Sequence, residues 1–297
     1  MSNAPRSLKL ESYAKINLGL RILDPRPDGY HDIATVLTPV HPCDEITLTP
    51  APEISMTCDN PNLASDGSNL CIRAAELVRS RFGAREGVRI DVKKRIPIGA
   101  GLGGGSSNAA AVLRGVLQLW SIDVADDVRG SLAASLGSDV PFFLRNGTAA
   151  ITGRGETVEY FDLDIPYWIL VVYPRIHCST AWAYAELDKE RAHSHRTQRG
   201  GEFSLKDDLQ RVITSVRELN SLLKNDFEPV VTRVYPVIHD VKQRLCDQGA
   251  VFAQMSGSGS SVYGLFENET HAQSARSHFT QASDIFLTPP HFSRSLR

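Results

Sequence analysis

The chain has 297 residues, a formal net charge of −2 and 22% charged residues, all ordinary for a globular protein. This balance gives no electrostatic preference for nucleic acid or an anionic membrane, and no apolar run is long enough to cross a bilayer. The five cysteines are scattered, with no Cys-x-x-Cys pair, which argues against a disulfide framework or a zinc site. We therefore expect a cytoplasmic protein whose own residues hold no metal.

The first half of the chain is predicted to contain strands followed by strand–helix units. Ile16, Leu18 and Leu20 alternate with polar or small residues, which is the period of a strand. Residues 7–50 are expected to form strands, with a turn-rich loop at 24–31 and two separate strands at 33–40 and 44–50. A further strand is expected at 88–92. Apolar spacing predicts helices over 69–82, 107–120 and 126–136.

The second half begins with an apolar run at 168–173 that suits a buried strand, and we place a domain boundary near residue 160. Residues 188–204 are polar and predict a mobile loop. Its histidines, His193 and His195, have no acidic or cysteine partner pattern, so a metal site is not favoured there. The remaining expected elements are a helix at 226–248, a strand, a second strand at 261–266, a helix at 269–281 and a strand at 284–288.

Residues 97–107, "PIGAGLGGGSS", form a glycine-rich run between an expected strand and an expected helix. Ordering such a run is costly, because glycine loses more conformational freedom on folding than any other residue. The first turn of a helix has unpaired N–H groups and partial positive charge, and bare glycines allow an anion to reach them. The run therefore predicts a phosphate-binding loop, with Ser106, Ser107 and Asn108 at the helix cap.

Two common phosphate-binding loops can be compared with this run. A Walker loop needs a lysine at the helix start, and none is present. Gly99, Gly101 and Gly104 match the dinucleotide fingerprint, but the strand before them carries Lys93–Arg95 and ends at Pro97. A Rossmann strand is buried on both faces and apolar, so this match is weak. A helix that merely follows a flexible loop is the structural alternative, and three consecutive glycines argue against it.

The segment "PIGAGLGGGSSNAAAVL" resembles the ATP-binding loop of the GHMP kinases. Further segments that resemble this family follow in order along almost the whole chain: "YAKINLGL", "DGYHDIATV", "GSDVPFF", "GRGE", "HCSTAWAY", "NDFEPVV" and "MSGSGSSVYGLF". The resemblance implies a two-domain α/β fold of the α+β type. A nucleotide-binding domain would cover residues 1–160, a ferredoxin-like domain would cover 161–297, and the active site would lie in the cleft between them.

Within this family, "DGYH" is typical of one branch. The resemblance implies transfer of the γ-phosphoryl group of Mg-ATP to the 2-hydroxyl of a cytidine-diphosphate-linked methylerythritol, on the non-mevalonate route to isoprenoids. The expected partners are small molecules alone, without nucleic acid or membrane, and the expected state is a monomer or weak homodimer. Two alternatives remain, namely another GHMP kinase of the homoserine or mevalonate type, and a non-catalytic nucleotide-binding regulator.

The resemblance assigns two catalytic residues. Asp139 matches the catalytic aspartate, which would accept the proton of the hydroxyl group; the structural alternative is a helix N-cap before Pro141. Lys15 matches the catalytic lysine, which would keep Asp139 ionised and neutralise charge on the transferred group. Strand alternation places Lys15 on one face with Asn17, and the pattern alone does not say whether this face meets solvent or a cleft.

The resemblance also assigns the ligand contacts. Residues matched to substrate binding are Asn17, Tyr30, His31, Thr180 and Tyr184, the two tyrosines being candidates to stack on a base. Residues matched to nucleotide binding are Pro97, Gly99, Gly101, Leu102, Gly103, Gly104, Gly105, Ser106, Ser107, Asn108, Asn69 and Lys94. A second glycine loop, residues 256–259, is expected to face the first across the cleft. Ser260 follows it where proline is expected, which predicts a looser turn.

Overall fold

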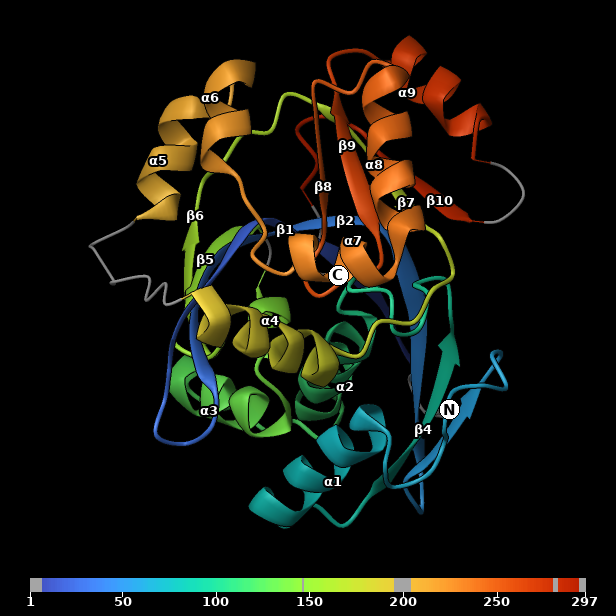
Figure 1. Cartoon of the computed structure of the whole chain (residues 1–297). Helices are drawn as coiled ribbons and strands as arrows, with labels where there is room; N and C mark the ends of the chain where they lie inside the picture. Colours follow the sequence, from blue (N-terminus) through green and yellow to red (C-terminus); the bar gives the residue numbers. More distant parts are fainter. Residues whose placement is uncertain (1–6, 146, 195–203, 280–282, 294–297) are drawn as a thin grey trace.

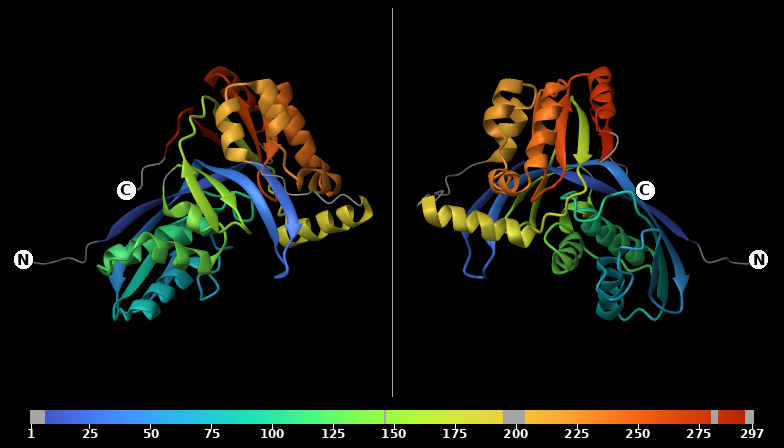
Figure 2. Two further views of the ribbon diagram at one scale, coloured as in Figure 1. Left: turned by 90° about the vertical axis from the view of Figure 1, so that its left-hand side faces the viewer. Right: turned by 45° about the vertical axis from the view of Figure 1, so that its right-hand side comes forward.

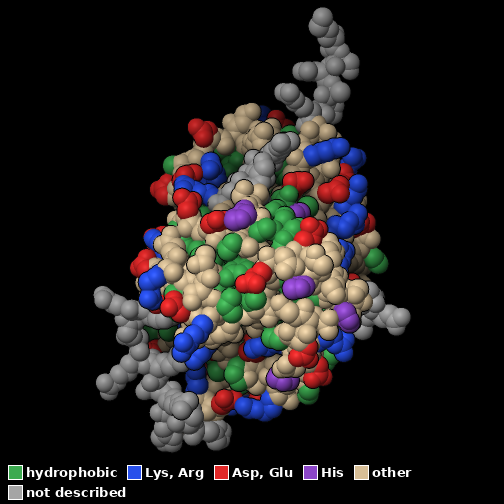
Figure 3. Space-filling view, turned by 90° about the horizontal axis from the view of Figure 1, so that it is seen from above, with side chains coloured by type: hydrophobic (Ala, Val, Ile, Leu, Met, Phe, Trp, Pro, Cys, Tyr) green, Lys and Arg blue, Asp and Glu red, His purple; other side chains and the backbone are tan. Residues whose placement is uncertain are grey.

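The computed structural model describes residues 7–145, 147–194, 204–279 and 283–293, without the side chains of residues 193 and 194. Two β-sheets organise these residues (Figure 1). Within the described ranges, no helix has the length and apolar character needed to span a membrane. Seen from above, acidic and basic side chains are interspersed over the surface (Figure 3).

The first sheet is built on one long antiparallel pair. Its strands are β1 (Leu8–Pro25), β2 (His31–Ala51), β3 (Ser55–Cys58), β4 (Gly87–Lys93), β5 (Thr148–Thr152) and β6 (Thr157–Phe161). The order is β3-β4-β2-β5-β6, with β1 also paired to β2. The separate strands expected at 33–40 and 44–50 are one strand, because β1 pairs with β2 on both sides of Pro42 and a register shift after Tyr13 absorbs the extra residues.

The second sheet has the order β10-β7-β9-β8, and its neighbouring strands are antiparallel. Its strands are β7 (Trp168–Tyr173), β8 (Phe252–Met255), β9 (Val262–Phe266) and β10 (Asp284–Thr288). The long β1–β2 pair arches between the two halves of the molecule (Figure 2). The chain leaves the first sheet at Phe161 and joins the second at Trp168. The domain boundary at residue 160 nevertheless stays a prediction.

The helices are α1 (Leu70–Phe82), α2 (Gly104–Leu119), α3 (Asp126–Leu136), α4 (Thr180–Ser194), α5 (Leu205–Val212), α6 (Val216–Leu222), α7 (Glu228–Val234), α8 (Pro236–Asp247) and α9 (Glu269–Ser277). A 3-10 helix, η1, covers Pro141–Leu144. The helix expected at 226–248 is divided into α7 and α8, because Pro236 has no N–H group to continue α7. Helix α2 starts at Gly104 rather than Ser107, because Ser107 N already donates to Gly103 O.

The polar loop expected at 188–204 is wrong in its first part, because α4 continues to Ser194. The rest of that loop, including His195, lies outside the described residues. Helix α5 was not anticipated, although Ser204 accepts a hydrogen bond from Asp207 N, a cap pattern that is visible in the sequence.

Strand β1 separates a packed interior from a polar site. Ala14, Ile16 and Leu18 are fully buried in an apolar core with Val171 and Tyr263 of the second sheet. Alternation along the strand places Lys15 and Asn17 on the other side, and both are buried as well. The face that carries Lys15 therefore points into the protein rather than into bulk solvent.

Candidate active site

The two glycine loops are in direct contact, whereas the sequence predicted that they face each other across a cleft. Ser256 Oγ donates to Gly101 O over 3.2 Å, and Ser261 N donates to Ala100 O over 3.2 Å. A Cβ atom on Gly101 would lie 2.6 Å from Ser256 O, and Gly101 has a φ of +77°. Only glycine fits this position, because any side chain would both clash with backbone and strain the left-handed conformation.

The first loop ends on an open helix N-terminus. Helix α2 begins at Gly104, and its first turn contains no acidic residue. A Cβ atom on Gly105 would meet no atom within 4 Å, so this side of the turn is open. Leu102 lies in the core, and its carbonyl accepts from Lys15 N over 3.0 Å, which ties the loop to β1. The arrangement suits an anion that approaches the first N–H groups of α2.

Lys15 lies at the centre of the site and is only 5% exposed. Its Nζ donates to Asn17 Oδ1 over 2.7 Å and lies 3.9 Å from Asp139 Oδ2. Burial lowers the pKa of Lys15 below its ordinary value of 10.5, and the nearby Asp139 charge partly offsets this effect. The Lys15 stem also packs against the loop, since a Cβ atom on Gly103 would lie 3.0 Å from Lys15 Cγ.

Asp139 lies in the turn between α3 and η1, with 42% of its side chain exposed. The structural alternative was a helix N-cap, but among the described residues η1 has no side-chain cap and begins after Val140. The carboxylate is thus open on one side and faces a buried ammonium on the other. This position suits a group that accepts a proton from a bound molecule.

Asn17 is held by contacts from both halves of the protein. Its Nδ2 donates to Thr35 Oγ1 over 3.0 Å, and its backbone N donates to Ser256 Oγ over 3.2 Å. The position of Asn17 beside Lys15 is therefore set by β2 and by the second glycine loop. Thr35 was missed in the sequence, where it is one of many threonines in strands.

His31 and Tyr184, both expected at the cytidine end, lie together. Their rings stack with centroids 5.2 Å apart and an interplanar angle of 20°. His31 Nε2 lies 2.9 Å from Asp188 Oδ1, and the rings of Tyr184 and Phe227 meet edge to face. Burial, with the charges of Asp139 and Asp188, raises the pKa of Tyr184 to about 12, so its hydroxyl stays protonated at neutral pH.

Tyr30, the other expected stacking residue, is 55% exposed. The Arg154 guanidinium lies over its ring at 5.1 Å, a cation–π contact that the sequence did not indicate. Thr180 Oγ1 lies 2.8 Å from Ser258 Oγ, so the start of α4 reaches the second glycine loop. His31 at the start of β2 thus meets Tyr184 and Asp188 of α4, whereas Asn17 lies beside Lys15 and the second glycine loop.

The second glycine loop is anchored on both sides. Asn225 Nδ2 donates to Met255 O and Gly257 O, each over 2.8 Å. Ser260, in place of the expected proline, is fully buried, and its Oγ donates to Ile176 O over 2.5 Å. The Ser260 hydroxyl thus supplies a bond that proline lacks, and the looser turn stays a prediction.

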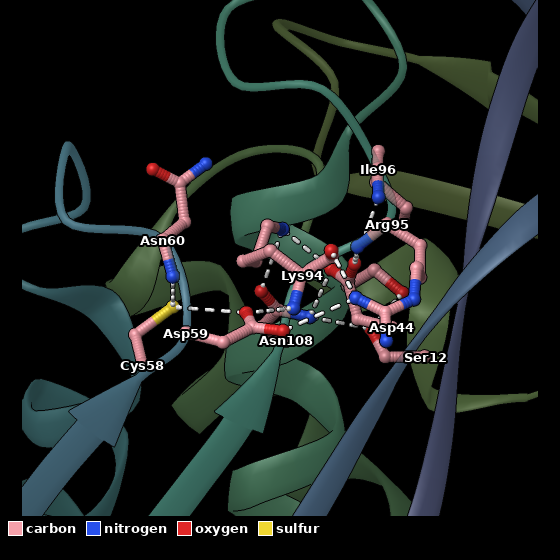
Figure 4. Close-up of polar contacts among 10 residues, drawn as sticks. Ser12, Asp44, Cys58, Asp59, Asn60, Lys94, Arg95, Ile96 and Asn108 are labelled. Atoms are coloured by element: carbon pink, nitrogen blue, oxygen red, sulfur yellow. Dashed lines mark hydrogen bonds and ion pairs between the residues drawn. The ribbon is translucent and has the colours of Figure 1, made fainter.

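Residues expected near the adenosine have their polar atoms engaged within the protein. Asn69 Oδ1 caps α1 by accepting from Cys71 N over 2.8 Å. Lys94 Nζ bonds to the buried carboxylate of Asp44 and donates to Asn108 Oδ1 over 3.1 Å (Figure 4). Asn108 Nδ2 in turn donates to Asp44 and to Ser12. We call Ser12, Asp44, Lys94 and Asn108 the Asp44 cluster; Asp44 was not among the site residues predicted from the sequence.

Among the described residues, no group of three or more His, Cys, Asp or Glu side chains is placed to hold a metal ion.

Comparison with known proteins places the chain in a family. The models of the N-terminal and C-terminal domains of GHMP kinases match residues 69–147 and 205–284. The chain is 42% identical over 289 residues to 4-diphosphocytidyl-2-C-methyl-D-erythritol kinase of Prosthecochloris aestuarii, covering 97% of this chain and 99% of the relative. It is 40% identical over 290 residues to the kinase of the same name from Chlorobaculum tepidum, again covering 97% and 99%.

Solved structures indicate the same family as these relatives. A crystal structure of 4-(cytidine 5'-diphospho)-2C-methyl-D-erythritol kinase superimposes with a TM-score of 0.77 and 31% identity, covering 95% of this chain and 98% of that one. Homoserine kinase from Cytophaga hutchinsonii has a TM-score of 0.72 at 17% identity, with 99% and 98% covered, which shows a shared fold. The chain therefore belongs to the 4-diphosphocytidyl-2-C-methyl-D-erythritol kinases, a branch of the GHMP kinases, and is an ATP-dependent small-molecule kinase with the two-domain GHMP fold.

Proposed function

We propose that this enzyme transfers the γ-phosphoryl group of ATP to the 2-hydroxyl of 4-diphosphocytidyl-2-C-methyl-D-erythritol, a step of isopentenyl diphosphate synthesis by the non-mevalonate pathway. The observation that carries the proposal is the pairing of buried Lys15 with half-exposed Asp139, 3.9 Å apart, beside the glycine loop. Phosphoryl transfer needs little more than a positioned donor, neutralised charge and a group that takes the hydroxyl proton.

Each part of the site has a role in this proposal. The open first turn of α2 and the glycines before it hold the ATP phosphates. Asp139 takes the proton of the acceptor hydroxyl, and Lys15 stabilises the negative charge that spreads over the transferred group. Magnesium would arrive bound to the ATP phosphates.

The residues that bind the acceptor in this proposal are far apart in the sequence. His31 and Tyr184 form one stacked unit, and Tyr30 presents an exposed ring nearby in the chain. Aromatic rings of this kind bind a nucleobase by its face. We also propose that Asn17 and Thr180 contact the substrate and that Asn69 and Lys94 contact the adenosine. We further propose that the protein is cytoplasmic and is a monomer or a weak dimer.

The proposed acceptor can be tested against the other substrates of GHMP kinases. We expect ADP release from ATP with 4-diphosphocytidyl-2-C-methyl-D-erythritol, and rates lower by about three orders of magnitude or more with homoserine or mevalonate, because the aromatic unit then has no base to bind. A coupled ADP assay measures this. CDP should also raise the melting temperature further in the presence of an ATP analogue, and equal turnover of all three acceptors would refute the assignment.

The lowered pKa of Lys15 predicts opposite pH effects on activity and stability. The folded pKa lies below the unfolded value of 10.5, so between these values the unfolded chain binds more protons and the free energy of unfolding rises with pH. Over the same interval the site loses the Lys15 charge, so kcat should fall. A kcat–pH profile measured by direct chromatography of ADP checks this, with melting temperatures in the same buffers. A rate that stays level up to pH 10.5 would contradict it, and a Lys15→Arg variant should lack this alkaline loss.

A further inference from the structure

Asp44 stands out as a completely buried carboxylate, with 0% exposure, that has no role in the proposed chemistry. Burying an ionised carboxylate is costly unless it is paired and fully hydrogen-bonded. Asp44 meets this requirement with four donors: the Lys94 ammonium, the Asn108 amide and the backbone N–H groups of Arg95 and Ile96. The partners of Asp44 show which parts of the protein this carboxylate holds in place.

The donors of Asp44 lie at both ends of the glycine run. Arg95 N and Ile96 N donate to Oδ1 over 2.6 and 2.8 Å, immediately before the run starts at Pro97. Asn108 Nδ2 donates to Oδ2 over 2.8 Å from the first turns of α2, immediately after the run. A single carboxylate therefore bridges the strand end and the helix start, as the close-up shows (Figure 4).

A second contact supports the helix end from the neighbouring strand. Ser12 lies directly opposite Asp44 in the β1–β2 pair. Its Oγ accepts from Asn108 Nδ2 over 2.9 Å and donates to Ser107 Oγ over 2.7 Å. Ser12 and Asp44, which are paired across two strands, thus both support the first turns of α2.

We infer that Asp44 is a positioning residue for ATP: through the Asp44 cluster it fixes both ends of the glycine run, so that the backbone N–H groups are ordered before the phosphates arrive. A run so rich in glycine has a large conformational entropy when free, and fixing its ends removes that cost from binding. Lys94 supplies the counter-charge of Asp44, so this carboxylate also fixes the ammonium that is proposed to contact the adenosine. The inference rests on the proposed function, since it assumes that the run binds the donor.

The test separates ATP binding from acceptor binding in four variants. Asp44→Asn leaves the Lys94 ammonium buried without a counter-charge, and the double variant D44N/K94M removes both charges so that the fold is kept. In both we expect KM for ATP to rise about tenfold or more, because ATP binding must then also order the glycine run. KM for the cytidyl acceptor should stay within about twofold. Ser12→Ala, which exposes no charge, should give a smaller rise in the same direction.

Asp59→Asn is the matched control. Asp59 accepts from Lys94 N over 2.7 Å and from Arg95 Nη1 over 3.1 Å, so it holds the same strand end but does not reach α2. It should leave KM for ATP within about threefold of wild type.

Melting-temperature shifts with an ATP analogue and with CDP, measured on each variant, read out binding without turnover. A lost ATP shift with an unchanged CDP shift in Asp44→Asn, and a reduced ATP shift in Ser12→Ala, support the inference, because both variants keep Lys94. If D44N/K94M and Ser12→Ala keep the wild-type KM for ATP, or if they weaken both ligands equally, Asp44 is only a stabilising residue and the inference is wrong. A wild-type enzyme that binds ATP but ignores the acceptor would refute the proposed function, and the melting-temperature shift with the ATP analogue would still test the role of Asp44.

Discussion

Asp139→Asn is expected to lower kcat by about two to four orders of magnitude while ATP still binds, because the amide cannot accept the proton of the acceptor hydroxyl. The substitution is nearly isosteric, and the carboxylate is 42% exposed, so little folding energy depends on it. Lys15 keeps its bond to Asn17 Oδ1, so the ammonium should stay in place. The loss should therefore appear in kcat and not in the affinity for ATP.

Single-turnover measurements with excess enzyme would separate this chemical step from product release. The melting-temperature shift with an ATP analogue should match wild type. Asp127→Asn is the control, since Asp127 is an exposed carboxylate in the first turn of α3, and it should keep full activity. Turnover by Asp139→Asn at the wild-type rate would remove Asp139 as the base and leave positioning and charge neutralisation as the means of catalysis.

The phosphate loop could be predicted from the sequence because its signal is local. A strand, a run of glycines and an apolar helical period stand next to each other between residues 88 and 120. Only the start of the helix was misplaced, at Ser107 instead of Gly104, because glycine is a poor helix former by propensity. The break at Pro236 was visible too, as was the Ser204 cap of α5, and both follow from ordinary helix signals.

The environment of each polar residue could not be predicted, because it depends on contacts between distant segments. The alternation of β1 put Lys15 and Asn17 on one face, but whether that face is wet depends on the second glycine loop, far along the chain. Asp44 is an acidic residue next to Glu45, and nothing in this short segment shows that one is buried and the other exposed. Its four donors come from the three residues that follow β4 and from α2.

Lys15 and Lys94 are both buried, but removing the charge of each should have opposite effects on the free energy of unfolding. Lys15 is held against its desolvation cost by the half-exposed Asp139, 3.9 Å away, and by its bond to Asn17 Oδ1. In Lys15→Met that carboxylate can be hydrated, so the free energy of unfolding should be unchanged or higher by about 1 kcal/mol. Activity should nevertheless fall by about two to three orders of magnitude, since a preorganised charge on the transferred group is lost.

Lys94→Met is the contrasting variant. It leaves Asp44 fully buried without its cation, so the free energy of unfolding should drop by about 3–5 kcal/mol. Urea unfolding of both variants, followed by circular dichroism at neutral pH, measures the two changes, and the ADP assay measures activity on the folded fraction. A Lys15→Met protein that is both inactive and strongly destabilised would contradict the prediction, because Lys15 would then be needed for the fold. Stability retained with activity lost means that the enzyme maintains a buried ammonium ion at a cost to its own stability, and that this charge serves the phosphoryl group.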